Sequence, residues 1–173
     1  MNIRSLIALF ALTTIAAHGA VTPEQAFASI KALKGDWHGP AAMKGMPPSH
    51  SVFRVTAGGS AVQETIFPGT PMEMLSVYHM DKGNLLMTHY CAIGNQPRMK
   101  LNAKKSTAQE LIFDFDGGTN FNPRRDKHMH SLTLKLSAPG KTAATKLTTS
   151  GTSWTDGKED PRTCGEITLT RRK

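Results

Sequence analysis

Cysteines, aromatic residues and long apolar runs are all scarce in this chain of 173 residues. Two cysteines are present, Cys91 and Cys164, which excludes the disulfide-rich scaffolds typical of small secreted proteins. The pair could form one disulfide in an oxidising compartment, but sequence spacing does not decide whether the two Cα atoms come close enough. Beyond residue 17 no stretch approaches the ~20 apolar residues of a membrane helix, so we expect no membrane span.

The one apolar run lies at the N-terminus and has the layout of a secretory signal peptide. Arg4 precedes the apolar residues 6–17, and the small residues Gly19 and Ala20 follow them. We therefore predict a signal peptide over residues 1–20, cleaved after Gly19 or Ala20, and an exported protein that is periplasmic or secreted. Residues 21–173 fit a single domain, because a chain of this length buries roughly 70% of its unfolded surface on folding.

Acidic residues are fewer than basic ones, 13 against 21, and the formal net charge is +8. Such a charge could favour polyanions or an anionic membrane surface. The basic residues are nevertheless scattered, with short runs only at 104–105, 124–125 and 171–173, and aromatic residues make up 6% of the chain. Because no basic patch with stacking aromatics is visible, we expect no nucleic-acid partner. The sequence leaves the oligomeric state open.

A short amphipathic helix is predicted close to the start of the mature chain. Thr22 can cap it, Pro23 suits its first turn, and Gln25 stands where a capping box requires Glu or Gln. Apolar residues then recur at helical spacing, and Gly35 ends the pattern. The members of this apolar stripe are Ala26, Phe27, Ile30 and Leu33.

The rest of the chain consists of short segments of β-type separated by turn signals. About ten strands are expected, counting one that begins at Gly35, and their spacing favours an antiparallel meander closed into a barrel or folded as a sandwich. We predict an all-β fold, an antiparallel up-and-down β-barrel with a short N-terminal helix. The other strands are expected at 51–57, 60–67, 73–80, 85–93, 98–104, 108–115, 128–137, 143–154 and 164–171.

Two segments at the ends of this strand series resemble the calycin superfamily, the up-and-down barrels of lipocalins and fatty-acid-binding proteins. Leu33-Lys-Gly35-Asp-Trp37-His-Gly39 resembles its Gly-x-Trp signature, and Ile167-Thr-Leu169-Thr-Arg171 resembles its last strand. The middle of the chain is similar to uncharacterised exported bacterial proteins of lipocalin-like type, in the segments Gly58-Gly-Ser60, Phe67-Pro-Gly-Thr70, Thr88-His-Tyr-Cys91 and Gly94-Asn-Gln-Pro-Arg98. The resemblance implies a lipocalin-like barrel domain over residues 21–173. It also implies that Arg171 packs across Trp37 and closes the barrel floor, a cation–π contact worth on the order of 1–2 kcal/mol.

Inward-facing positions of a small barrel alternate with outward-facing ones along every strand. Leu132, Leu134 and Leu136 mark the inner face of their strand, and the same alternation places His128 and His130 on it. We therefore expect both histidines inside the cavity or at its open end.

The same test adds candidates from three other strands. His89 and Cys91 share the apolar face of residues 85–93, and Glu64 shares that of residues 62–66. In the strand at 73–80 the alternation does not decide whether the tyrosine or the following histidine faces inward. The candidate ligand-binding residues are Glu64, Tyr78, His89, Cys91, His128 and His130.

The leading hypothesis is non-catalytic binding of a small, partly apolar molecule whose polar or anionic end contacts these side chains. An alternative is a metal site, because His89, Cys91, His128 and His130 are the nitrogen and sulfur ligands that zinc prefers. Haem held by one of the histidines is a variant of that alternative.

Two further readings stay open. Catalysis by Cys91 or a histidine requires a hydrogen-bonded pair oriented by a third group, which the His89/Cys91 spacing does not provide by itself. The common motifs of hydrolases, nucleotide-binding proteins and metalloproteases are absent from the sequence. In the last reading the barrel is filled by its own side chains and the protein works through its basic surface.

Overall fold

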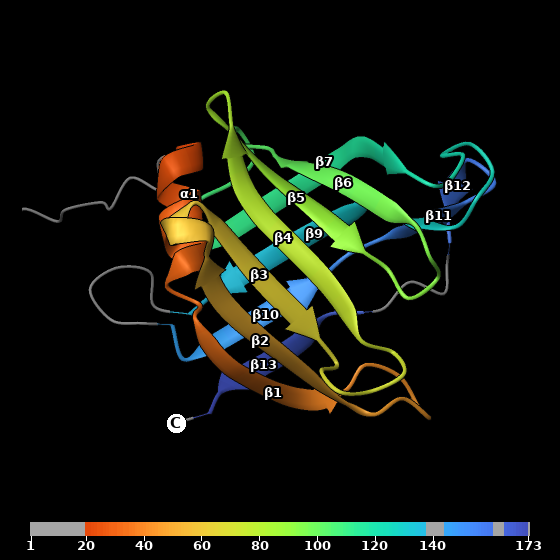
Figure 1. Cartoon of the computed structure of the whole chain (residues 1–173), viewed down its shortest axis with the longest axis horizontal. Coiled ribbons are helices and arrows are strands. Elements are labelled where there is room, and N and C mark those ends of the chain that lie inside the picture. The colour runs from red at the N-terminus through yellow and green to blue at the C-terminus, as the bar shows by residue number, and fades with distance from the viewer. Residues whose placement is uncertain (1–19, 138–143, 161–164, 173) are drawn as a thin grey trace, which may run out of the picture.

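The computed structural model describes residues 20–137, 144–160 and 165–172. Ten strands close into an antiparallel barrel, with one short helix at one end (Figure 1). The predicted fold class, an all-β up-and-down barrel with an N-terminal helix, is therefore confirmed. Residues 1–19 and Cys164 lie outside the described residues, so the signal peptide and the Cys91–Cys164 disulfide stay predictions.

Around the barrel, most strands pair with their neighbours in the sequence, as the long turn-linked meander predicts. The ladder closes where the first strand pairs with the last. A separate three-stranded sheet is formed by β8, β11 and β12, which are inserted between barrel strands. In their order around the barrel the strands are β1 (Gly35–Ala41), β13 (Ile167–Arg171), β10 (Lys146–Ser150), β9 (Ser131–Leu136), β7 (Glu110–Thr119), β6 (Gln96–Leu101), β5 (Asn84–Tyr90), β4 (Met74–Asp81), β3 (Ala61–Ile66) and β2 (Pro48–Thr56). The small sheet consists of β12 (Lys158–Glu159), β11 (Ser153–Thr155) and β8 (His128–Met129).

Helix α1 (Pro23–Lys31) closes one end of the barrel, where it contacts β4 and β5 (Figure 1). Its start follows the prediction, because Thr22 accepts a hydrogen bond from the backbone N–H of Gln25 and the Gln25 side chain accepts one from the N–H of Thr22. The predicted apolar stripe faces the barrel: Ala26, Phe27, Ile30 and Leu33 are all buried.

Trp37 fills the barrel floor beneath this helix. Its ring is completely buried, and its indole N–H donates a hydrogen bond to the carbonyl oxygen of Leu33 at 2.7 Å. Trp37 is the direct cross-strand partner of Arg171, whose guanidinium carbon lies 4.5 Å from the centre of the indole ring. The contact that the resemblance implies is confirmed.

The inner face of the barrel follows the alternation for most strands. Val62 and Glu64 are buried on β3, and Met87 and His89 are buried on β5. On β4 the structure decides what the sequence left open, since Tyr78 is completely buried and therefore faces inward.

The strand predicted at 128–137 is an exception, because it is interrupted at His130. Residues 128–129 form β8 and pair with β11, whereas β9 starts at Ser131 and belongs to the barrel. The backbone N–H groups of His130 and Ser131 both point at the carbonyl oxygen of Thr152, at 2.7 and 3.4 Å. This irregularity changes the phase of the alternation, so that Met129, and not His130, lines the barrel cavity with His128.

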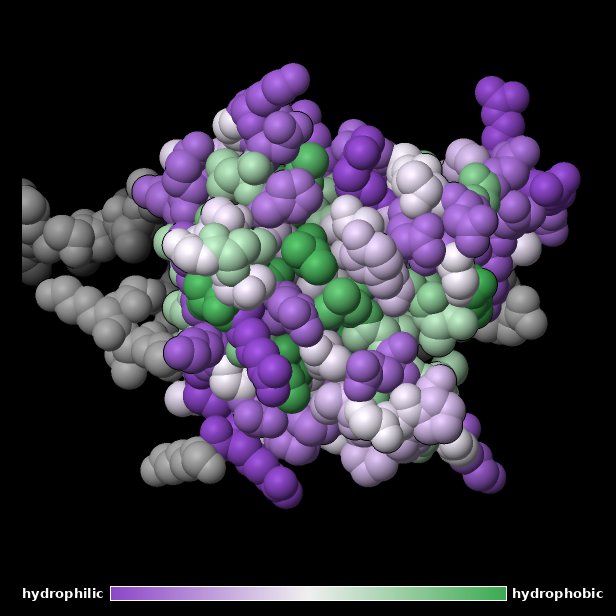
Figure 2. All heavy atoms as spheres, viewed as in Figure 1, coloured by the Kyte–Doolittle hydropathy of each residue, from purple (hydrophilic) through white to green (hydrophobic). Residues whose placement is uncertain are grey.

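The outer surface is mainly polar. On the face drawn in Figure 2, apolar side chains are scattered among hydrophilic ones. The most exposed large apolar residue among those described is Ile93, at 59% exposure, which also lines the barrel cavity. Within residues 20–137, 144–160 and 165–172, no helix has both the length and the apolar character needed to cross a membrane.

Candidate ligand-binding site

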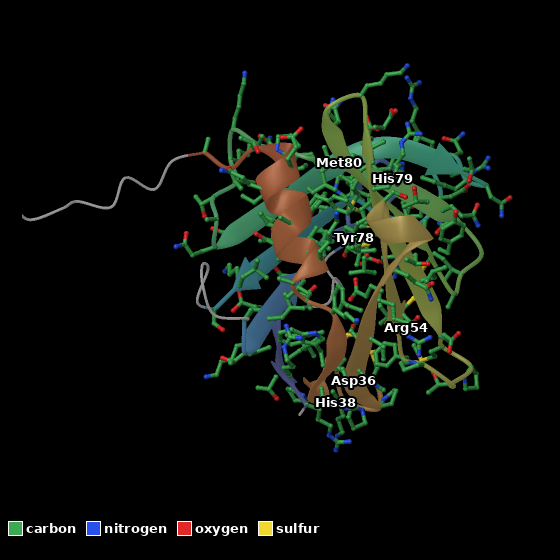
Figure 3. The ribbon with its side chains drawn as sticks, turned by 60° about the vertical axis from the view of Figure 1, so that its left-hand side comes forward. Asp36, His38, Arg54, Tyr78, His79 and Met80 are labelled. Carbon is green, nitrogen blue, oxygen red and sulfur yellow. The ribbon has the colours of Figure 1, made fainter. Side chains whose placement is uncertain are left out.

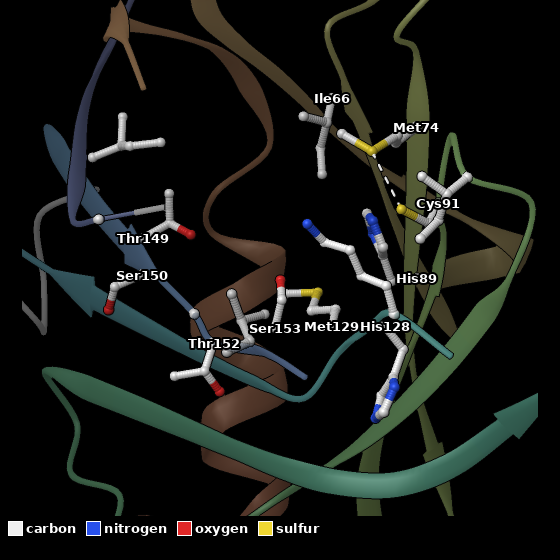
Figure 4. Close-up of a pocket in the computed structure, with 16 residues that line it drawn as sticks. Ile66, Met74, His89, Cys91, His128, Met129, Thr149, Ser150, Thr152 and Ser153 are labelled. Carbon is white, nitrogen blue, oxygen red and sulfur yellow. Dashed lines mark hydrogen bonds between the residues drawn. The ribbon is translucent and has the colours of Figure 1, made fainter. Parts of the chain in front are cut away.

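A cavity of about 280 Å³ lies inside the barrel at the end remote from α1 (Figure 4). The end of β3, the start of β4 and the end of β5 form one wall, and β8, β10 and the start of β13 form the other. Its lining is predominantly apolar, with aliphatic side chains and the sulfur atoms of Met74, Met129 and Cys91.

A second, smaller lobe of about 180 Å³ adjoins the first. Four residues line both lobes, so the two spaces are neighbours within one interior. Glu64, Ser49, Ser51 and His50 provide most of the polar part of the second lobe. The hydroxyl oxygen of Ser49 is buried without a hydrogen-bond partner in the described part of the chain. The four shared residues are Ile66, Met74, Thr149 and Ile167.

Glu64 is a buried carboxyl group held by two donors from neighbouring strands. Ser51 donates to Oε1 and the Tyr78 hydroxyl donates to Oε2, both at 2.9 Å. Burial raises the pKa of Glu64, and the two hydrogen bonds oppose that rise only in part. Burial, together with the neighbouring carboxyl group, also raises the pKa of Tyr78. The structure thus brings together two of the predicted site residues.

Sequence reasoning missed Ser49 and Ser51, although a signal for them exists. Both stand in phase with the buried Phe53 along β2, so their positions on the inner face follow from the alternation. The predicted strand at 51–57 contains Ser51 and begins two residues after Ser49.

His89 stands on β5, is 5% exposed, and lines the larger lobe. Its Nδ1 lies 3.0 Å from the Ser76 hydroxyl on the paired strand β4. Burial lowers the pKa of His89 to about 4, so its ring is neutral at pH 7. Its other ring nitrogen, Nε2, has no hydrogen-bond partner among the described residues. One nitrogen of a buried imidazole is therefore available to a molecule in the cavity.

Cys91 also lines this lobe, next to Met74, with the two sulfur atoms 4.0 Å apart (Figure 4). The hydrogen-bond partner of its thiol, within the residues described, is this methionine and not a histidine. The Cys–His pair that nucleophilic catalysis requires is therefore not formed here.

His128 and His130 are hydrogen-bonded to each other at the edge of the cavity. Because a carbonyl oxygen can only accept, the 2.8 Å contact between Nδ1 of His128 and the Asp126 oxygen assigns the proton to that nitrogen. In neutral His128, Nε2 then accepts from Nδ1 of His130, 3.0 Å away. Both nitrogens of His128 are thus engaged within the protein.

The His130 ring lies between two aromatic side chains outside the cavity. It stacks on Trp154 with ring centres 3.8 Å apart and on Phe115 with ring centres 4.5 Å apart. Burial, followed by the neighbouring His128, lowers the pKa of His130. Its surroundings therefore favour the neutral ring and make it part of an aromatic stack.

The four side chains predicted as metal ligands, His89, Cys91, His128 and His130, do not converge on one point. The described residues contain one group of three or more His, Cys, Asp or Glu side chains whose ligand atoms all lie within 4.8 Å of one another, and this group lies elsewhere. It consists of Asp36, His38 and His50 on the outside of the barrel. The reason is register: alternation places residues on one face but does not make them neighbours across strands.

No protein-family model and no curated protein matches this chain. The barrel is confirmed by the structure itself, and the calycin relationship stays a prediction carried by the Gly35-x-Trp37 segment and by Arg171.

Proposed function

We propose that the protein is an exported, non-catalytic binding protein of calycin type that holds one small, partly apolar molecule inside its barrel. The observation that carries this proposal is the apolar cavity together with the buried polar atoms in its wall. The Ser49 hydroxyl oxygen is buried without a partner among the described residues, and Nε2 of the buried His89 side chain has no hydrogen-bond partner there either. Buried polar atoms are normally hydrogen-bonded, and a polar group of a bound molecule would satisfy them.

The size of the cavity limits the ligand. A volume of about 280 Å³ is close to the lower end of the ~300–1,000 Å³ range of pockets that hold drug-sized molecules. The aliphatic and sulfur-containing lining favours a mainly hydrocarbon body. We therefore expect a compact molecule whose body occupies the larger lobe, with the adjoining lobe of about 180 Å³ open to one of its groups.

The charges around the cavity favour an uncharged polar group on this ligand. Lys127 is the one Lys or Arg among the described lining residues, and its ammonium group is paired with the buried carboxylate of Asp160 at 3.1 Å. Burying an unpaired anion beside the neutral ring of His89 and the carboxyl group of Glu64 would cost several kcal/mol. A hydroxyl, carbonyl or amide group would avoid this cost and still bond to His89.

The direct test is to analyse the untagged mature protein, purified from its own export compartment, by organic extraction and mass spectrometry. A single small organic molecule in near-stoichiometric amount would support the proposal. A second measurement titrates the protein with the neutral apolar dye N-phenylnaphthylamine and follows dye fluorescence.

The matched variants for this titration are Thr149→Phe and Thr148→Phe. Thr149 lines both lobes, so phenylalanine there fills the interior, whereas Thr148 is the next residue on the same strand and bonds to Thr168 on the outer face. We expect Thr149→Phe to weaken dye binding at least tenfold and Thr148→Phe to leave it unchanged. Equal binding by both variants, or no dye binding and no extracted molecule, would overturn the proposal.

A further inference from the structure

Three metal-ligating side chains meet on the outer surface of the barrel, on strands β1 and β2. Because Trp37 points into the floor, the residues on either side of it, Asp36 and His38, point outward. His38 is paired directly with His50 across the β1–β2 ladder. Figure 3 shows Asp36 and His38 close together on β1, at the lower edge of the view.

The three side chains already contact one another. His50 Nε2 lies 3.3 Å from Oδ1 of Asp36, and the rings of His38 and His50 stack with centres 4.1 Å apart and an angle of 20° between their planes. Each residue presents one ligand atom such that all three atoms lie within 4.8 Å of one another.

We propose that Asp36, His38 and His50 form a binding site for a divalent transition-metal ion of the zinc and copper class. Two imidazole nitrogens and a carboxylate oxygen suit these ions, with bonds of about 2.0–2.2 Å for zinc. Around a tetrahedral ion such bonds separate neighbouring ligand atoms by roughly 3.3 Å. Small side-chain rotations close the present separations to that value, and the partly exposed side chains permit them.

The position of the group predicts an exchangeable site. The Asp36 side chain is 55% exposed and that of His50 is 29% exposed, so water completes the coordination shell. Arg172, whose backbone N–H bonds to the Asp36 carbonyl oxygen at 2.9 Å, adds positive charge nearby. The carboxylate of Asp36 offsets that charge. The site is therefore suited to reversible binding of an available ion, and the fold does not depend on the metal.

The test is a calorimetric titration of the untagged mature protein with Zn²⁺, repeated for single variants. We expect one equivalent to bind to the wild type. His38→Ala and His50→Ala should each weaken binding by at least about tenfold, since losing even a group that only supports a ligand has an effect of this size. Asp36→Asn should weaken it as well. All three positions are at the surface, so circular dichroism should show an unchanged fold.

The matched control is His79→Ala, which removes an imidazole from β4, well apart from Asp36 and His38 in Figure 3. The zinc affinity of His79→Ala should equal that of the wild type. A separate measurement uses Cu²⁺ bound to the wild type, whose electron paramagnetic resonance spectrum should show nitrogen couplings from two imidazoles.

Three results would overturn the proposal: no zinc binding by the wild type, binding that survives in both His38→Ala and His50→Ala, or loss of binding in Cys91→Ser, which would place the ion in the cavity. The outcome can be told apart from that of the dye titration, because Asp36 and His38 line neither lobe of the cavity.

Discussion

The guanidinium group of Arg171 covers the indole ring of Trp37, with its central carbon 4.5 Å from the ring centre. Its N–H groups also donate to three backbone carbonyl oxygens, those of Ala32 at 2.7 Å, Ala144 at 3.2 Å, and Lys34. One side chain on the last strand therefore ties together the end of α1, the start of β1 and the segment before β10. The closed end of the barrel depends on this arrangement.

Trp37→Ala should lower the free energy of unfolding by about 3–5 kcal/mol, because it leaves a large cavity at the floor and removes the surface on which Arg171 rests. Urea denaturation followed by far-UV circular dichroism measures this loss. Met43→Ala, at an exposed position, is the control. A Trp37→Ala variant as stable as the wild type would contradict the calycin-type floor.

The neutral state of His89 should make stability depend on pH. Burial lowers the pKa of His89 to about 4 from 6.5, so its contribution is present above pH 6.5 and is lost as the pH falls towards 4. His89→Gln lacks this titration. The free energy of unfolding of the wild type, relative to that of His89→Gln, should fall by about 3 kcal/mol as the pH is lowered from 7 to 4. Urea melts across this range provide the test, and a constant difference would show that the ring is not held neutral.

Glu64 should have the opposite pH dependence. Burial raises the pKa of Glu64 above 4.5, so the folded state holds its proton more tightly than the unfolded state does. Its favourable contribution is therefore present below pH 4.5 and is lost as the pH rises through the folded pKa. Glu64→Gln should gain stability relative to the wild type as the pH rises from 4.5 to 7.

Glu159→Gln, at an exposed position, is the matched control for Glu64→Gln in urea melts over the same range. If Glu64→Gln instead loses stability relative to the wild type with rising pH, a charged carboxylate must be favoured in the folded state. The present description of the second lobe would then be wrong.

His130→Ala should loosen the small sheet without changing the cavity. It removes the ring between Phe115 and Trp154 and the hydrogen bond to His128, so amides of β8 and β11 should exchange hydrogen faster while those of β3 to β5 do not. Dye affinity should stay within about twofold, since His130 does not line the cavity. His130→Phe should restore protection by keeping the stack. Normal protection combined with lost dye binding would return His130 to the ligand site.

The sequence by itself determined the features that depend on neighbours along the chain. The capping box of Thr22 and Gln25 is a contact over three residues, so it can be recognised without tertiary information. The alternation of side chains along a strand has a period of two, so it assigns Glu64 and His89 to the inner face without information on their partners. The antiparallel meander of about ten strands follows from the same local pattern and from the turn signals between the segments.

The tertiary structure alone decided which strands put their side chains next to each other. The Glu64–Ser51 and His89–Ser76 pairs and the group of His38, His50 and Asp36 are contacts across strands, and their register depends on turns and on packing. A one-residue change of register moves a side chain to the opposite face. For that reason the irregularity beside Thr152 interrupts the strand at His130 and brings Met129 into the cavity lining, a change that no local pattern in the sequence predicts.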